Sequence, residues 1–290
     1  MSGEFPLDPA ESAESAETPG PSHVPLTDDA PDALAPRGLH RRSAPGPAPV
    51  PVPVPVPPRS GTRPRGGPGA RVERSRRARM LPLGVALSAG LLLFAATSYA
   101  VLGAGADVVD RPVLSAVVRH RQAVLDGPVT FLTHASEIPL LVLAVLLALW
   151  LSWRDRSWQP PLLIGGASAL AVTAATVAKE ITDRTRPPAR LWEISENGYC
   201  FPSRHAVTAT AVLLVLAYVL AARAASRVAR IALWSGAAVL SLLAGGSRVY
   251  LGVHWPTDVI GGLTLGTVVT LLVILVHKLW EAPRPGHPSR

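Results

Sequence analysis

The chain has 290 residues, of which 48% are hydrophobic, yet its formal net charge is +8. These properties belong to different regions. Residues 1–79 hold more than half of the 30 prolines and no apolar run, whereas the chain from Leu81 onward is mainly Leu, Ala, Val and Gly. This division predicts a disordered tail followed by a membrane domain, and it argues against a folded basic module that binds nucleic acid. The single cysteine, Cys200, excludes an intrachain disulfide and argues against a cysteine-based metal site.

The charge of the tail changes along its length. Residues 1–35 are acidic, and residues 37–79 are rich in arginine. The stretch PAPVPVPVPVPP predicts a polyproline II spacer, which has no means of burying a core. The basic stretch 71–80 directly precedes the first apolar segment, and by the positive-inside rule it predicts that this end of the first span is cytoplasmic.

Six apolar segments then approach the length of about 20 residues that spans a bilayer. The second is the weakest of them, because its fully apolar part covers only 138–153. The predicted fold class is therefore all-α, a polytopic membrane protein with a six-transmembrane-helix bundle at 80–280 and a short cytoplasmic tail at 281–290. The six spans are predicted at 81–103, 134–153, 160–180, 205–223, 228–246 and 259–279.

A cytoplasmic start for the first span fixes the side of every later loop. Both chain ends are then cytoplasmic, and the loops 104–133, 181–204 and 247–258 lie on the non-cytoplasmic face. The first of these loops is interpreted as short interfacial helices. The other two carry many cations, which is unusual for external loops and indicates a function. Because the charges gather at the ends of spans and not along them, a channel or transporter pathway is disfavoured.

The two later external loops share several cations and few carboxylates. Lys179, Arg186 and Arg248 can converge because both loops emerge on one membrane face. Guanidinium groups suit phosphate, since they donate two hydrogen bonds in a fork. Ser203 stands where a helix should start, so that it is either an N-cap, part of an anion site at a helix N-terminus, or both. Arg184 is interpreted as an interfacial anchor or as a residue of headgroup entry.

Two histidines lie in the same loops. His254 and Asp258 are four residues apart, and a carboxylate on one imidazole nitrogen raises the nucleophilicity of the other, as in a hydrolase dyad. The alternative is an ordinary surface pair. His205 falls in the first turn of the fourth span, where it either points into the same site or is an interfacial polar residue.

Three motifs in this region resemble those of the type 2 phosphatidic acid phosphatase superfamily, which comprises membrane lipid phosphatases related to the vanadium haloperoxidases. The family pattern K-x6-R-P is matched by KEITDRTRP at 179–187, and S-R-x5-H-x3-D is matched by SRVYLGVHWPTD at 247–258. The pattern P-S-G-H is matched by PSRH at 202–205, which departs from the family because Arg204 stands in place of Gly.

The resemblance implies a role for each matched residue. His254 would attack phosphorus and form a phosphohistidine, Asp258 would orient it, and His205 would be the general acid for the leaving group. Arg204 keeps the backbone N–H that the Gly lends to phosphate, and its side chain either adds a cation or faces lipid headgroups. No metal and no cofactor are expected, since no cluster of carboxylates lies near these loops. The implied phosphate-binding residues are Lys179, Arg186, Ser203, Arg204 and Arg248.

The sequence thus predicts a metal-independent lipid phosphatase, integral to the cell membrane, with its active site on the non-cytoplasmic face. Its expected partners are the lipid bilayer and a membrane lipid phosphate, either phosphatidic acid, phosphatidylglycerol phosphate or a polyprenyl diphosphate such as undecaprenyl diphosphate; no nucleic acid is expected. Two alternatives stay open, a lipid phosphotransferase that uses an alcohol as acceptor and a non-catalytic lipid-phosphate-binding protein. The sequence does not indicate the preferred lipid or the oligomeric state.

Overall fold

The computed structural model describes residues 68–103 and 105–281, so the predicted disordered tail lies outside the described residues except for its end, where the first helix already begins. Within the described residues the chain forms eight α-helices, one short 3-10 helix and no strand, which confirms the all-α fold class. The elements are α1 (Pro68–Leu102), α2 (Asp107–Arg119), α3 (Ala123–Ala135), α4 (Ile138–Asp155), α5 (Gln159–Thr182), η1 (Ala189–Leu191), α6 (Arg204–Ala221), α7 (Arg227–Tyr250) and α8 (Pro256–Trp280).

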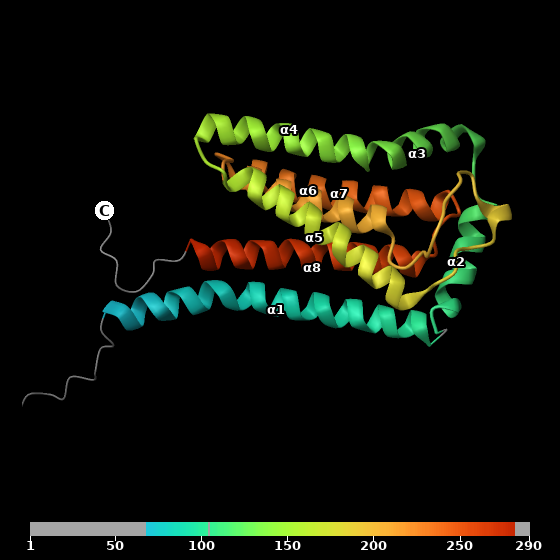
Figure 1. Cartoon of the computed structure of the whole chain (residues 1–290), viewed down its shortest axis with the longest axis horizontal. Coiled ribbons are helices and arrows are strands. Elements are labelled where there is room, and N and C mark those ends of the chain that lie inside the picture. The colour runs from blue at the N-terminus through green and yellow to red at the C-terminus, as the bar shows by residue number, and fades with distance from the viewer. Residues whose placement is uncertain (1–67, 104, 282–290) are drawn as a thin grey trace, which may run out of the picture. The chain divides into compact units, whose positions relative to one another are not determined.

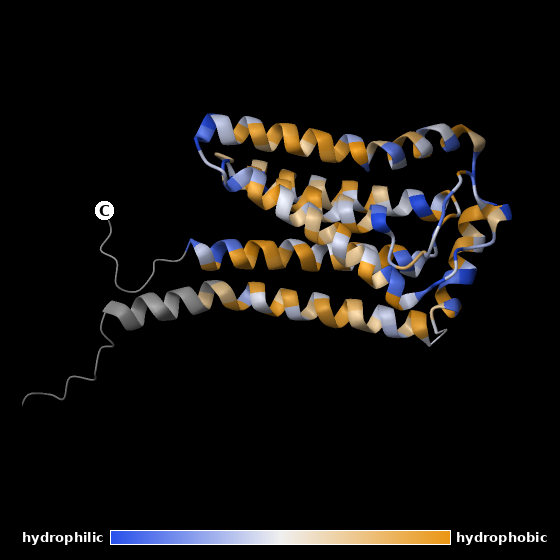
Figure 2. Ribbon diagram, viewed as in Figure 1, coloured by the Kyte–Doolittle hydropathy of each residue, from blue (hydrophilic) through white to orange (hydrophobic). Residues whose placement is uncertain are grey.

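Six of these helices are long and apolar enough to cross a bilayer, namely Met80–Leu102 of α1 together with α4, α5, α6, α7 and α8. They lie alongside one another, and hydrophobic residues dominate their middle parts while polar residues gather towards their ends (Figure 2). The helices α2 and α3 and the segment 183–203 lie at one end of the bundle, and the α4–α5 loop lies at the other (Figure 1). The protein is therefore an integral membrane protein with the predicted six-span bundle.

The second span differs from the sequence prediction at its start. It begins at Ile138 instead of residue 134, because α3 ends at Ala135 and a separate helix begins with Pro139 in its first turn. Proline is favoured there, since the first turn of a helix does not need its N–H. The predicted interfacial segment before it forms α2 and α3. The junction between α3 and α4 is consequently a bend between two helices, not the first turn of a single span.

The two most buried spans are α6 and α8, which bury 61% and 56% of their apolar windows. Two glycines of α8 allow their close approach. A methyl group added at Gly262 would lie 2.8 Å from the backbone oxygen of Ser203, and one at Gly266 would lie 2.6 Å from that of Val207. Small residues at helix interfaces in membranes serve this purpose. As a result, the N-termini of α6 and α8 meet, and Ser203 N–H donates to the carbonyl of Asp258 at 3.0 Å.

Candidate active site

The three sequence motifs converge at the end of the bundle that carries α2 and α3. The first motif runs from the last turns of α5 into the segment 183–203, the second begins α6, and the third joins the end of α7 to the start of α8. They surround a cavity of 230 Å³. Five of the eight predicted site residues line this cavity: Lys179, Arg186, Arg204, His205 and His254.

His254 lies between a carboxylate and a guanidinium. Its Nδ1 is 3.2 Å from Asp258 Oδ2, and its Nε2 is 3.1 Å from Arg186 Nη1. An ionised carboxylate only accepts hydrogen bonds and a guanidinium only donates them. The imidazole therefore carries its proton on Nδ1 and presents a lone pair at Nε2. Burial lowers the pKa of His254 to about 4 in spite of the opposing effect of Asp258, so the ring is neutral at pH 7.

Asp258 is fully buried, and every partner that it has stabilises its ionised form. Besides His254, it accepts hydrogen bonds from the backbone N–H of Trp255 at 2.8 Å and from Arg184 Nη1 at 2.6 Å. Arg184 in turn donates to Asp110 of α2. Its side chain is 11% exposed and paired with two carboxylates, so the interpretation of Arg184 as an interfacial anchor is wrong.

The arginines of the site meet an internal anion, Glu196. Arg248 is 1% exposed and donates to Glu196 Oε1 and, at 2.9 Å, to Thr133 Oγ1 of α3. Arg186 Nη2 lies 3.5 Å from the other oxygen of Glu196. Burial raises the pKa of Glu196, but Arg248 and Arg186 outweigh this effect and hold it below its usual value. An ionised carboxylate thus sits between two of the predicted phosphate-binding arginines, and sequence reasoning gave it no role.

Ser203 occupies the N-cap position of α6 without capping the helix through its side chain. The residue is fully buried, and its Oγ has no hydrogen-bond partner among the residues that the structure describes. A buried hydroxyl without a partner is costly. Ser203 is thus at the predicted start of the helix, but its side chain does not cap it, which leaves the hydroxyl available to another partner. Lys179 faces the same cavity, where its Nζ donates to the carbonyl of Tyr199.

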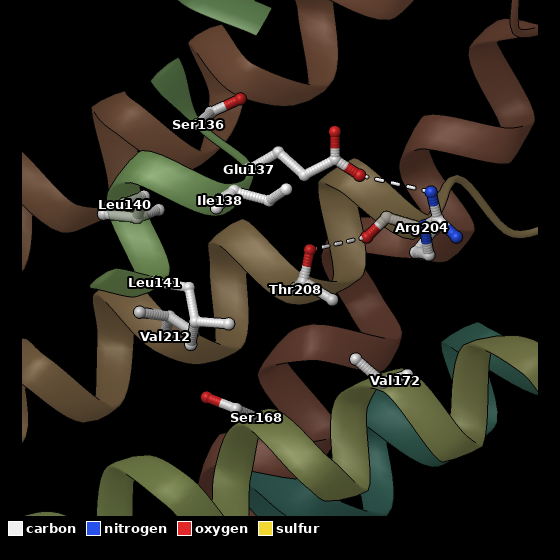
Figure 3. A pocket seen from close by; sticks show the side chains of 10 residues that line it. All are labelled: Ser136, Glu137, Ile138, Leu140, Leu141, Ser168, Val172, Arg204, Thr208 and Val212. Atoms are coloured by element: carbon white, nitrogen blue, oxygen red, sulfur yellow. Dashed lines mark hydrogen bonds and ion pairs between the residues drawn. The ribbon is translucent and has the colours of Figure 1, made fainter. Parts of the chain in front are cut away.

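The side chain of Arg204, which replaces the family Gly, pairs with a carboxylate at the edge of the cavity. Its Nη2 lies 3.2 Å from Glu137 Oε1, and the pair is drawn in Figure 3. The second oxygen of Glu137 lies 3.1 Å from His205 Nε2. Sequence reasoning missed Glu137, although a lone carboxylate directly before the apolar run that begins at Ile138 was a signal.

Comparison with known proteins agrees with this geometry. The family model of the PAP2 superfamily matches residues 141–281. Phosphatidylglycerophosphatase B of Bacillus subtilis is 36% identical over 171 residues, which cover 57% of this chain and 81% of that protein. The chain belongs to the PAP2 superfamily. The family and the phosphatase class that the three motifs predict are confirmed.

Two further likenesses place the chain within the PAP2 superfamily. Decaprenylphosphoryl-5-phosphoribose phosphatase of Mycobacterium tuberculosis is 33% identical over 172 residues, which cover 57% of this chain and 82% of that protein. The crystal structure of a transmembrane PAP2 type phosphatidylglycerolphosphate phosphatase from Bacillus subtilis matches with a TM-score of 0.63 at 29% identity. The match covers 68% of this chain and 98% of that one.

Proposed function

We propose that this PAP2 protein hydrolyses the phosphate ester of a membrane lipid through a covalent phosphohistidine on His254. The observation that carries the proposal is the orientation of the His254 imidazole, with Nδ1–H on Asp258 and the Nε2 lone pair on the side of Arg186. A carboxylate in this position raises the nucleophilicity of the opposite nitrogen and stabilises the positive charge that develops when that nitrogen attacks.

The cations around the cavity suit the charge of a phosphoryl group in transfer. Catalysis of phosphoryl transfer consists mainly of positioning and of stabilising charge on the non-bridging oxygens. The residues proposed for this purpose share N–H or O–H donors, and each of them lines the cavity or adjoins a residue that lines it, near the N-terminus of α6 with its free N–H groups. They are Lys179, Arg186, Ser203, Arg248 and the backbone N–H of Arg204.

The reaction then has two steps. His254 Nε2 forms a bond to phosphorus while the bond from phosphorus to the leaving oxygen breaks, and His205 gives a proton to that oxygen. Water next attacks the phosphohistidine with His205 accepting its proton, and inorganic phosphate leaves with His254 restored. No step calls on a metal ion, and the proposal therefore expects full activity in the presence of a chelator.

An apolar groove of the protein lies beside the phosphate cavity and can bind the lipid part of the substrate. The groove lies between α4, α5 and α6, has a volume of 280 Å³ and is lined by side chains such as Leu141, Val172 and Val212 (Figure 3). Arg204 belongs to both the groove and the phosphate cavity. A lipid that enters sideways from the membrane can thus place a chain in the groove and its phosphate among the cations.

We place this end of the bundle on the non-cytoplasmic side. The opposite end carries the basic stretch 71–80 at the start of α1 as well as basic residues in its short connections, and such residues favour the cytoplasm (Figure 1). Those of the α4–α5 and α6–α7 connections and their flanks are Arg154, Arg156, Arg223, Arg227 and Arg230.

The proposal is tested by phosphate release in detergent with EDTA present, comparing the wild type with His254→Ala. The panel consists of phosphatidic acid, phosphatidylglycerol phosphate and undecaprenyl diphosphate, because the relatives named above include both glycerolipid and polyprenyl phosphatases. Release by the wild type alone supports the proposal, and the preferred lipid defines the substrate. Equal release by His254→Ala, or a loss of activity with EDTA, contradicts it. A phosphorylated product formed from added glycerol would instead favour a phosphotransferase.

A further inference from the structure

Glu137 lies outside all three motifs and contacts the imidazole of His205. It is the residue just before α4, and its two carboxylate oxygens face different partners, Oε2 the Nε2 of His205 at 3.1 Å and Oε1 the Nη2 of Arg204 at 3.2 Å. The His205 side chain is 7% exposed and that of Glu137 35% exposed. A carboxylate only accepts hydrogen bonds, so His205 Nε2 carries a proton in this arrangement.

The carboxylate of Glu137 lies at the bend between α3 and α4. Thr133, near the end of α3, accepts a hydrogen bond from Arg248 at 2.9 Å. Glu137 lines the apolar groove, His205 lines the phosphate cavity, and Arg204 lines both. The pair of Glu137 and His205 therefore stands at the boundary between the two, which is where the oxygen that links lipid to phosphate must lie.

We infer that Glu137 is a positioning residue for His205, stabilising the imidazolium that protonates the leaving oxygen, and that Arg204 fixes the carboxylate of Glu137. The inference rests on the proposed function, because it takes His205 as the general acid. In the step concerned, the proton moves from the imidazolium to the leaving oxygen as the bond from phosphorus to that oxygen breaks. Glu137 stays ionised throughout.

The charges around His205 explain why such a carboxylate is needed. The groups that act on it are Arg248 of α7, Glu196 of the segment 183–203, its neighbour Arg204, and His134 of α3. The His205 side chain is buried, and both this burial and the cations oppose a protonated imidazole, while Glu196 is already paired with two arginines. Glu137 offsets the cations from hydrogen-bond distance of the ring, 3.1 Å from Nε2. The arginine at the family Gly position then has a function, because it orders the carboxylate that the acid requires.

The alternative is that Glu137 merely neutralises Arg204 on a half-exposed surface, where ion pairs contribute little. The two roles differ in their dependence on the leaving group. Hexyl phosphate and p-nitrophenyl phosphate are similar in size, but only the alkoxide needs a proton to depart, whereas p-nitrophenolate leaves without one. The quotient kcat/KM reports on the steps up to phosphohistidine formation, so later hydrolysis does not mask the effect.

The test is kcat/KM of Glu137→Gln on both esters. General acid catalysis supplies about 10²–10⁴-fold, and we expect the loss of its positioning carboxylate to lower the value for hexyl phosphate about 10–100-fold. The value for p-nitrophenyl phosphate should change less than about 3-fold, since no acid is used in that step. The control is Asp155→Asn at the other end of α4. That carboxylate pairs with Arg223 at 2.7 Å, is 31% exposed and should leave both values unchanged.

Equal losses on both esters, or no loss on either, would overturn the inference. If the wild type releases phosphate from neither ester and His254→Ala changes nothing, the proposed function fails first and the inference fails with it. If the wild type is active on both esters and Glu137→Gln changes kcat/KM for neither, the inference is contradicted while the proposed function stands.

The part played by Arg204 is tested by a double-mutant cycle. Arg204→Gly keeps the backbone N–H and removes the guanidinium, so we expect a smaller loss with the same preference for hexyl phosphate. In the Glu137→Gln background the same change should add no further loss, because residues that act through one interaction are not additive. Additive losses would show that Arg204 acts independently of Glu137.

Discussion

At His254, the proposed nucleophile, the direction of each hydrogen bond decides which ring nitrogen keeps a lone pair for attack. Asp258 uses Oδ2 for Nδ1–H of His254 and Oδ1 for a guanidinium N–H of Arg184. The dyad therefore depends on an acceptor at both positions of the carboxylate. Asparagine has the same shape but offers one acceptor and one donor, so it cannot accept hydrogen bonds from both His254 and Arg184.

This leads to a prediction for Asp258→Asn. The guanidinium of Arg184 requires the amide oxygen, which leaves the amide NH₂ against His254 Nδ1. That contact favours the tautomer with its proton on Nε2, and the attacking lone pair is lost. We expect kcat to fall about 10³–10⁴-fold while the protein stays folded. Activity within about 10-fold of the wild type would contradict this account of the dyad.

The buried position of His254 predicts an unusual titration. Because burial lowers its pKa to about 4, the ring is neutral and nucleophilic above that pH and becomes protonated only as the pH falls through it. Nitrogen chemical shifts of histidine-labelled protein in detergent measure this directly, with His254→Ala used to assign the signal. A midpoint near the ordinary value of about 6.5 would contradict the prediction.

At the level of elements, the segment 183–203 brings its own carboxylate between two of the arginines proposed for phosphate. Glu196 must be displaced, or must share Arg186 and Arg248, when an anion enters. We expect Glu196→Gln to strengthen inhibition by inorganic phosphate, lowering its inhibition constant about 10-fold, because the competing charge is removed. The matched control is Glu193→Gln in the same segment, whose carboxylate pairs with Arg121. An unchanged or weaker inhibition by phosphate would contradict the prediction.

A buried carboxylate of the short helix α2 joins it to α8 by hydrogen bonds and to Arg184 by an ion pair. Asp110 is fully buried, and it accepts hydrogen bonds from the backbone N–H of Thr257 at 2.8 Å and from its hydroxyl at 2.6 Å, as well as from Arg184. Removing one partner of a buried charge pair leaves the other uncompensated. The contact thus fixes α2 to the same turn of α8 that carries Asp258.

We therefore expect Asp110→Ala to destabilise the protein by about 3–5 kcal/mol. This corresponds to a fall in the thermal unfolding midpoint on the order of 10 °C, measured in detergent. Asp107→Ala on the same helix removes an exposed pair with Arg111 and should have little effect. Equal midpoints for the two variants would show that the buried contact does not hold α2 in place.

For the whole molecule, the spans were predictable because a bilayer requires long apolar helices. The six runs differ from the observed helices by a few residues at most ends. The motif residues were predictable as a set, because three spaced motifs in the right order are a specific pattern. That residues of the two later external loops can converge followed from topology, since two loops on one membrane face can meet; five of the eight predicted residues line one cavity.

The supporting residues could not be predicted, because they depend on the register between helices that are distant in sequence. Glu137 meets Arg204 across 67 positions, and Asp110 meets Arg184 across 74. The start of the second span was placed four residues early because hydrophobicity alone does not reveal the bend between α3 and α4, just before Pro139. That bend decides where Glu137 points.

The glycine contact between α6 and α8 has a consequence for how this enzyme can evolve. His205 belongs to the first turn of α6, and His254 just precedes α8, so the spacing between the proposed proton donor and the proposed nucleophile follows from two backbones in contact. A Cβ at Gly262 would lie 2.7 Å from that of Ala206, and it would force the two groups apart without touching either. Substitutions on the lipid-facing surface can therefore accumulate while the contact between α6 and α8 at Gly262 keeps the two histidines at a fixed spacing.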